Sequence, residues 1–149
     1  MIDEIEQAPA QLRQAVSGLS SAQLDTRYRD WTIRQIAYHL ADSHVNSYVR
    51  FKLTLTEDNP TIKPYKEGLW SALDDARHGD IEIALQLFDA IHARWLPSLR
   101  QMTPEQFART FFHPESGESL SLDVALGYYA WHGRHHIGQI LWLRNQHQF

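Results

Sequence analysis

Apolar residues recur along most of the chain at spacings of three, four or seven positions, which is the repeat of one face of an α-helix. In the first part of the chain this face consists of Ile5, Leu12, Val16 and Leu19. The pattern predicts a first long helix that Gly18 helps to end. Ser20 and Gln23 have the spacing of a capping box and predict a short helix immediately afterwards.

A second long helix is predicted within residues 29–58, a stretch that contains no glycine or proline. Thr32 and Gln35 form its capping pair, and the Asn59-Pro60 step ends it. The apolar stripe of this helix is expected to face the interior of the fold. Its members are Ile33, Ala37, Leu40, Tyr48 and Phe51.

Two further long helices complete the pattern. The third covers residues 81–102, and Pro97 is expected to kink or shorten it. Ser121 is placed to cap a final helix that runs to about Asn145. Shorter helices are predicted within residues 65–76 and 103–109, and a loop or small hairpin within residues 110–122.

The fold class that follows is all-α, a four-helix bundle with short extra helices and one loop or small hairpin. No internal repeat, low-complexity run or linker divides the chain. Residues 1–149 are therefore predicted to form a single domain.

Composition narrows the functions that such a bundle can have. The net charge is −4 and no basic stripe is present, so we do not expect a nucleic acid partner. No stretch reaches the length of about 18 apolar residues that a membrane span needs, and the acidic amino-terminal stretch does not look like a secretory signal. We expect a cytoplasmic protein. Because the chain has no cysteine, a transition-metal site must use mainly His, Asp or Glu.

Three histidines lie close together in the stretch YAWHGRHHIGQI, residues 129–140. His132 and His136 are four positions apart, so in a helix they share one face and can reach a single ion. His135 points roughly 60–100° away from them. The spacing alone fits a pair of core histidines bonded to backbone or tyrosine equally well.

A third ligand has to come from elsewhere, and the second long helix contributes His39 and His44. His44 falls on the apolar stripe, and periodicity slightly favours it as the inward residue. His39 lies on a polar flank that also carries Gln35, Ser43, Asn46 and Arg50. Buried in a bundle, this flank would supply partners that orient metal ligands; exposed, it would be an ordinary solvated face.

The remaining histidines are weaker candidates. His92 lies on the apolar face of the third long helix, where a core histidine is expected. His113 lies in FFHPESG, on a loop that is able to close over a site. His78 and His147 are expected at the surface.

Three blocks of the chain, taken in order, resemble the YfiT-like branch of the DinB superfamily. They are residues 31–65, FFHPESG at 111–117, and YAWHGRHHIGQI. The resemblance runs from about Leu24 to Asn145. Members of this branch are described as metal-dependent hydrolases, and some relatives act as bacillithiol S-transferases. The resemblance implies a four-helix bundle with a metal-dependent activity.

The resemblance also implies a divalent metal, zinc or nickel, that is held by three histidines. One comes from the second helix and two come from an HxxxH pair that is followed by Gln on the last helix. In this sequence they are His39, His132 and His136, with Gln139 in the matching position. The resemblance thus selects His39 over His44. It further implies a homodimer.

Three imidazoles leave free positions on a metal, and such an open site is typical of catalysis rather than of structure. The metal would activate a low-molecular-weight thiol for attack on an electrophilic small molecule, or alternatively water for hydrolysis. A non-catalytic metal-binding bundle is the further alternative. Asn46 and Arg50, on the flank of His39, are the candidate substrate contacts. Weaker candidates are Tyr48, Arg134 and His135.

Overall fold

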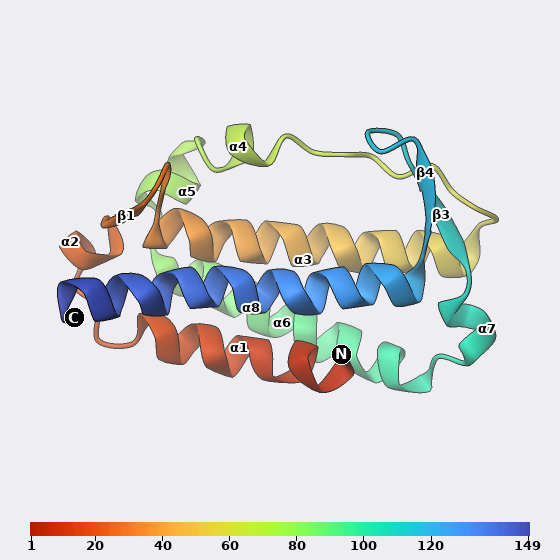
Figure 1. Ribbon diagram of the computed structural model, residues 1–149, viewed down its shortest axis with the longest axis horizontal. Coiled ribbons are helices and arrows are strands. Elements are labelled where there is room, and N and C mark those ends of the chain that lie inside the picture. The colour runs from red at the N-terminus through yellow and green to blue at the C-terminus, as the bar shows by residue number, and fades with distance from the viewer.

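Four long helices lie side by side in a computed structural model that describes residues 1–149 (Figure 1). They are α1 (Ile2–Val16), α3 (Ile33–Thr56), α6 (Ile81–Gln101) and α8 (Leu122–His147). Helix α1 packs against α6 and α8, and α3 packs against the same two helices from the other side. This arrangement confirms the predicted four-helix bundle.

Short elements connect the long helices at both ends of the bundle, and the connection between α3 and α6 runs back along the side of α3 (Figure 1). They are α2 (Ser21–Leu24), β1 (Arg27–Tyr28), β2 (Trp31–Thr32), α4 (Glu67–Trp70), α5 (Asp74–His78), α7 (Pro104–Phe107), β3 (Thr110–His113) and β4 (Glu118–Ser121). The strands form two antiparallel hairpins, β1–β2 and β3–β4. The second is the small hairpin expected between α7 and α8. The chain between α3 and α4 lies against it, because Ile62 donates to Phe112 and Phe112 donates to Pro60.

The helix starts follow local sequence signals. The three pairs with capping-box spacing all form both of their hydrogen bonds, at the starts of α2, α3 and α7. Gly18 has a φ of +75°, a conformation that suits glycine, and α1 ends just before it. Ser121 precedes α8 as expected but makes no capping bond. Pro97 was expected to kink or shorten its helix; the shortening is wrong, because α6 continues to Gln101.

The bundle has two apolar cores, of 18 and 11 buried residues. A layer of buried histidines lies between them. On α3, for example, the first core ends at Ala41 and the second begins at Phe51, and His44 lies in between. His92 on α6 and His132 on α8 occupy the equivalent places on their helices. Polar side chains in such a layer need partners, because an unpaired buried polar group is costly.

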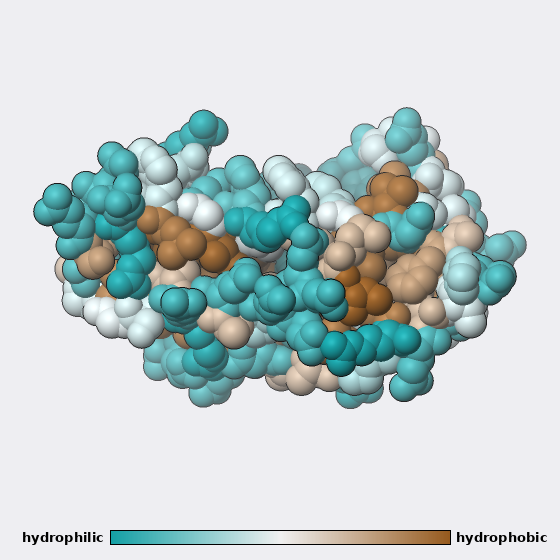
Figure 2. Space-filling model, turned by 60° about the horizontal axis from the view of Figure 1, so that its bottom comes forward, coloured by the Kyte–Doolittle hydropathy of each residue, from teal (hydrophilic) through white to brown (hydrophobic).

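The face on the side of α1 is shown in Figure 2. Apolar residues gather there in two patches with hydrophilic residues between them. None of the helices combines the length and the apolar character that crossing a bilayer requires.

Candidate metal centre

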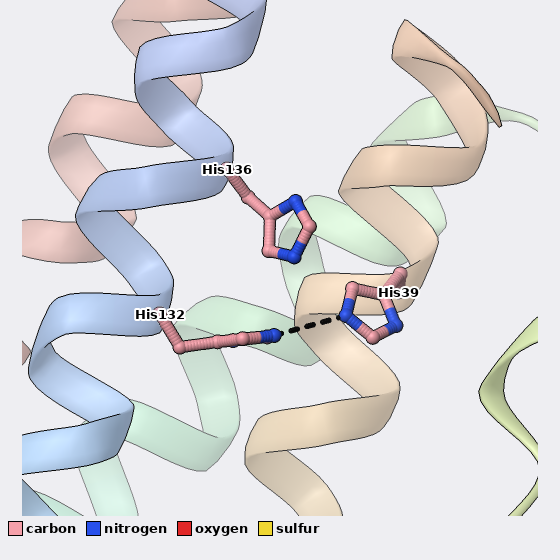
Figure 3. A group of neighbouring side chains, drawn as sticks. All are labelled: His39, His132 and His136. Atoms are coloured by element: carbon pink, nitrogen blue, oxygen red, sulfur yellow. Dashed lines mark hydrogen bonds between the residues drawn. The ribbon is translucent and has the colours of Figure 1, made fainter. Parts of the chain in front are cut away.

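Three histidine side chains converge between α3 and α8. His39 projects from α3, and His132 and His136 project from successive turns of α8 (Figure 3). One nitrogen from each ring lies within 4.8 Å of the other two. The ring centroids are 4.5 to 5.0 Å apart. The four-residue spacing on α8 and the packing of α3 against α8 therefore produce the cluster that the sequence suggested.

The donor geometry fits a single metal ion. The Nε2 atoms of His39 and His132 are 3.0 Å apart. Two imidazole nitrogens at 2.0–2.1 Å from one tetrahedral ion lie about 3.3 Å apart, so only a small adjustment would be needed. No other His, Asp or Glu belongs to the group, and the arrangement therefore leaves part of the coordination sphere open.

The protein environment keeps these imidazoles uncharged, as metal ligation requires. Burial, followed by the charge of His136, lowers the pKa of His39 to about 3. Burial, followed by the charges of the neighbouring histidines, lowers the pKa of His132 to about 2. Burial also lowers the pKa of His136, against the opposing effect of its hydrogen bond to Gln139. All three rings can therefore offer lone pairs.

Gln139 orients one ring of the cluster. The Nδ1–H group of His136 donates to Oε1 of Gln139 over 2.9 Å, which leaves the Nε2 lone pair of His136 free. The amide nitrogen of Gln139 donates in turn to Nε2 of His135, also over 2.9 Å. His135 thus supports the site through Gln139 and lies outside the cluster. The family resemblance implied the position of Gln139 but gave this residue no role.

Aromatic rings surround the histidines. The half-buried ring of Trp31 lies 4.5 Å from that of His39 and 6.0 Å from that of His136, centroid to centroid. Tyr128 stacks on His132 at 5.7 Å. Neither aromatic residue was predicted from the sequence. Trp31 precedes the cap of α3 and so belongs to no helical stripe, whereas Tyr128 lies one turn before His132 and was detectable by its spacing.

His44 is buried, as its place on the apolar stripe indicated, but it is not part of the cluster. Its Nδ1 atom lies 2.9 Å from Nε2 of His92. Its ring centroid is 6.2 Å from that of His132, whereas the ring of His39 is 5.0 Å from it. Of the two histidines left open by periodicity, the structure therefore brings His39 to the HxxxH pair.

A cavity of about 650 Å³ opens beside the cluster, and His132 is part of its wall. Arg50 also lines the cavity, and its Nη1 atom donates to the hydroxyl of Tyr129 over 2.7 Å. The Nε atom of Arg50 is buried without a partner. His113 reaches the cavity from the β3–β4 hairpin, which fits the expectation that this loop could close over a site. Lys66 contributes a second cationic side chain.

The other candidate contacts lie outside this cavity. The amide of Asn46 donates back to the carbonyl of Asp42 over 2.8 Å. The hydroxyl of Tyr48 accepts a hydrogen bond from Arg94. Arg134 forms an ion pair with Glu4 on α1. These polar groups are therefore engaged within the bundle or at its surface.

Comparison with known proteins agrees with the fold and with a metal-dependent enzyme class. YfiT of Bacillus subtilis (strain 168) is 50% identical over 141 residues, which are 93% of this chain and 79% of that protein. A Bacillus cereus (strain B4264) protein named "Putative metal-dependent hydrolase" is 50% identical over 147 residues, 97% of this chain and 84% of its own length. Both relatives are thus named as metal-dependent hydrolases.

The solved structure of Bacillus subtilis YfiT, described as a probable metal-dependent hydrolase with an unusual four-helix bundle topology, matches 99% of this chain and 86% of that chain. The TM-score is 0.96 at 48% identity. A mycothiol-dependent maleylpyruvate isomerase matches 93% of this chain and 58% of its own with a TM-score of 0.74 at 12% identity, which shows a shared fold alone. Residues 4–140 match the family model of the DinB superfamily. The chain belongs to the DinB superfamily.

Proposed function

We propose that His39, His132 and His136 bind one divalent ion, zinc or nickel, and that the protein is a metal-dependent enzyme acting on a small molecule in the adjoining cavity. The observation that carries this proposal is the convergence of three uncharged imidazoles, without a fourth protein ligand, beside a cavity of about 650 Å³ whose wall includes His132. A structural metal site would be closed by four protein ligands. The naming of the relatives as metal-dependent hydrolases supports the same class.

A divalent ion at this place supplies a Lewis acid that lowers the pKa of a thiol or water at its open position. The protein contributes the surroundings. Gln139 keeps the proton of His136 on Nδ1, so that Nε2 points to the open site. Trp31 and Tyr128 pack against the rings of His39 and His132.

We infer that the nucleophile is a low-molecular-weight thiol and that the reaction is S-transfer. The thiol sulfur forms a bond to an electrophilic carbon, the leaving group departs with its electron pair, and the thiol proton goes to solvent. A thiol has a pKa near 8.5 and needs no separate base once a cation lowers that value. Hydrolysis in helical zinc sites relies on a glutamate base. No Asp or Glu belongs to the histidine cluster, whereas Glu67 and Glu115 line the cavity. Hydrolysis stays the alternative because the relatives carry that name.

Arg50 is the residue that we propose for binding the polar end of the substrate. Its guanidinium lines the cavity, forms no ion pair within the chain and has a buried Nε–H group without an acceptor. A carboxylate on the substrate would satisfy both the charge and the hydrogen bond. Asn46 shares the helix but not the cavity, and we leave it out of the proposed contacts.

The nucleophile can be identified by incubating the metal-loaded protein with a chloro-aromatic electrophile and a panel of small thiols. We expect consumption of the electrophile that depends on the added thiol and that a chelator abolishes. If chloride is released to the same extent with and without added thiol, the reaction is hydrolysis and not S-transfer. If a chelator lowers the melting temperature while no substrate is consumed under any condition, the site is a non-catalytic metal site.

We also propose a homodimer in the cytoplasm, where small thiols are kept reduced. An exposed stripe on α8 supports the dimer, because its members recur at helical spacing and are each about half exposed. They are Val124, Tyr128, Trp131 and Trp142. Light scattering after gel filtration measures the mass directly. A particle of twice 17.4 kDa is expected, and a monomer at micromolar concentration would contradict the proposal.

A further inference from the structure

The histidine layer has a defined direction of hydrogen bonding that starts at α1. The carbonyl oxygen of Ile5 lies 2.7 Å from Nδ1 of His92. A carbonyl only accepts, so Nδ1 of His92 carries the proton. His92 is uncharged, because burial lowers its pKa to about 4, and its Nε2 atom is therefore an acceptor. That atom lies 2.9 Å from Nδ1 of His44, so His44 must also carry its proton on Nδ1.

This chain of bonds ends on an unsatisfied acceptor. The Nε2 atom of His44 is fully buried and has no partner. It lies against Gly133, where a Cβ atom would come within 3.9 Å of both Nε2 and Cε1 of His44. The acceptor edge of His44 thus faces α8 beside His132.

A matching donor is found on His132. The Nδ1 atom of His132 is also buried without a partner. Its Nε2 atom faces His39 within the cluster, as Figure 3 shows. If Nε2 of His132 binds a metal, the neutral ring must keep its proton on Nδ1. A buried donor on His132 and a buried acceptor on His44 therefore lie on neighbouring rings whose centroids are 6.2 Å apart.

We infer that His44 and His92 are positioning residues for the metal centre: His44 accepts the Nδ1 proton of His132, directly or through one buried water, and His92 holds His44 in the tautomer that can accept it. The inference rests on the proposed function only in assigning Nε2 of His132 to the metal. It makes the orientation of one metal ligand depend on all four long helices, through Ile5 on α1, His92 on α6, His44 on α3 and His132 on α8.

Such a partner fixes the ring of the ligand and raises its basicity, and the loss of a partner of this kind typically weakens metal binding about 10- to 100-fold. His92 was expected to be a core histidine, and its burial agrees with that. Packing alone does not require the alternation of donor and acceptor along Ile5, His92 and His44. A hydrocarbon ring would fill the same space without leaving unsatisfied polar atoms.

The first test is a zinc titration of the full chain in competition with a chromophoric chelator. His44→Phe removes the acceptor and is expected to weaken zinc binding about 10- to 100-fold. His44→Gln is the matched control, because its side-chain carbonyl can take the place of Nε2. We expect His44→Gln to recover most of the affinity. Equal zinc affinity of His44→Phe and wild type would overturn the inference, as would a loss that His44→Gln fails to recover.

The second test needs no variant and therefore does not depend on variants that fold. Histidine ¹⁵N–¹H correlation spectra report which ring nitrogen carries the proton. We expect Nδ1–H for His92, His44 and His132 in the zinc-loaded protein. A proton on Nε2 of His44 would exclude the inference whether or not zinc binds. If the protein binds no zinc, the proposed function is wrong. The tautomer of His44 in the metal-free protein still tests the inferred hydrogen bonds from His92 to His44 and from His44 to His132.

Discussion

Oε1 of Gln139 accepts the Nδ1 proton of His136 over 2.9 Å, three residues apart on α8. This contact determines which nitrogen of His136 points into the cluster. The pair lies at the outer side of the site, where His136 is only partly buried and would otherwise exchange its proton position with solvent. A helical turn thus supplies both a candidate ligand and the group that orients it.

Replacing Gln139 with Leu should weaken zinc binding about 10- to 100-fold, because the ring of His136 loses its acceptor and can rotate. The competition titration with a chelator measures the change. Gln139→Glu keeps an acceptor for His136 and should retain most of the affinity. His135→Ala removes the acceptor of the Gln139 amide nitrogen but leaves Oε1 in place for His136. It should therefore have a smaller effect than Gln139→Leu. An unchanged affinity in Gln139→Leu would show that the contact has no part in binding.

Each histidine of the cluster should be needed for stoichiometric metal. After loading with excess zinc or nickel and gel filtration, elemental analysis should find close to one ion per wild-type chain. His39→Ala, His132→Ala and His136→Ala should each leave far less than that. His44→Ala should keep a stoichiometric ion under these saturating conditions, since His44 affects affinity without ligating. Loss of the ion in His44→Ala, with retention in His39→Ala, would reverse the assignment.

Arg50 offers a test of substrate binding that is separate from the metal. Arg50→Met removes a charged donor from the cavity wall, and a hydrogen bond to a charged group contributes about 1.5–3 kcal/mol. We expect KM for a carboxylate-bearing substrate to rise about 10- to 100-fold, with an unchanged metal content. Lys52→Met is the control, because it removes a positive charge from an exposed position of α3 outside the cavity. Equal effects of the two substitutions would mean that general charge, and not Arg50, is responsible.

Local chemistry made much of the fold predictable. The Thr32 and Gln35 cap depends on groups only three residues apart, and the structure forms both of its bonds. The convergence of His132 and His136 likewise follows from the pitch of one helix. Pro97 does not end α6, because a proline within a helix is tolerated where the freed carbonyl can be hydrated. Ala93, whose carbonyl loses its donor, and Pro97 itself are both exposed.

Periodicity could not choose between His39 and His44 as the third metal ligand, because both side chains are buried. What separates them is the neighbour that each one meets: His44 bonds to His92 on α6, and His39 lies against the pair on α8. That difference depends on how α3 is rotated relative to two other helices, which no local pattern encodes. Family resemblance provided the information instead. The cavity could not be predicted from the sequence either, because its wall is formed by α3, α8, the chain before α4 and the β3–β4 hairpin.

Acid should destabilise the metal-free protein through its buried histidines, and His92 provides the clearest case. Its folded-state pKa is about 4, because burial outweighs the opposing effects of the Ile5 carbonyl and the Asp89 carboxylate. In the unfolded chain the value is about 6.5. Between these values the unfolded state binds a proton that the folded state does not. The stabilisation is therefore complete above pH 6.5 and is lost as the pH falls toward 4, at up to about 1.4 kcal/mol per pH unit for this group.

Urea unfolding of the metal-free protein at pH 8, 7, 6 and 5 measures this dependence. The free energy of unfolding should be nearly constant from pH 8 to 7 and should fall below pH 6.5. His44, whose pKa is also lowered by burial, adds to the fall. Asp42 opposes it, because burial raises the pKa of its carboxyl to about 6 and the folded state then binds the extra proton. His92→Phe isolates the contribution of His92. Below pH 6.5 the slope of the free energy of unfolding against pH reports how many more protons the unfolded state binds, and this number should be smaller than in wild type by up to one. An unchanged slope would mean that His92 already carries a proton in the folded state, and the direction of its bond to His44 would then have to be reversed.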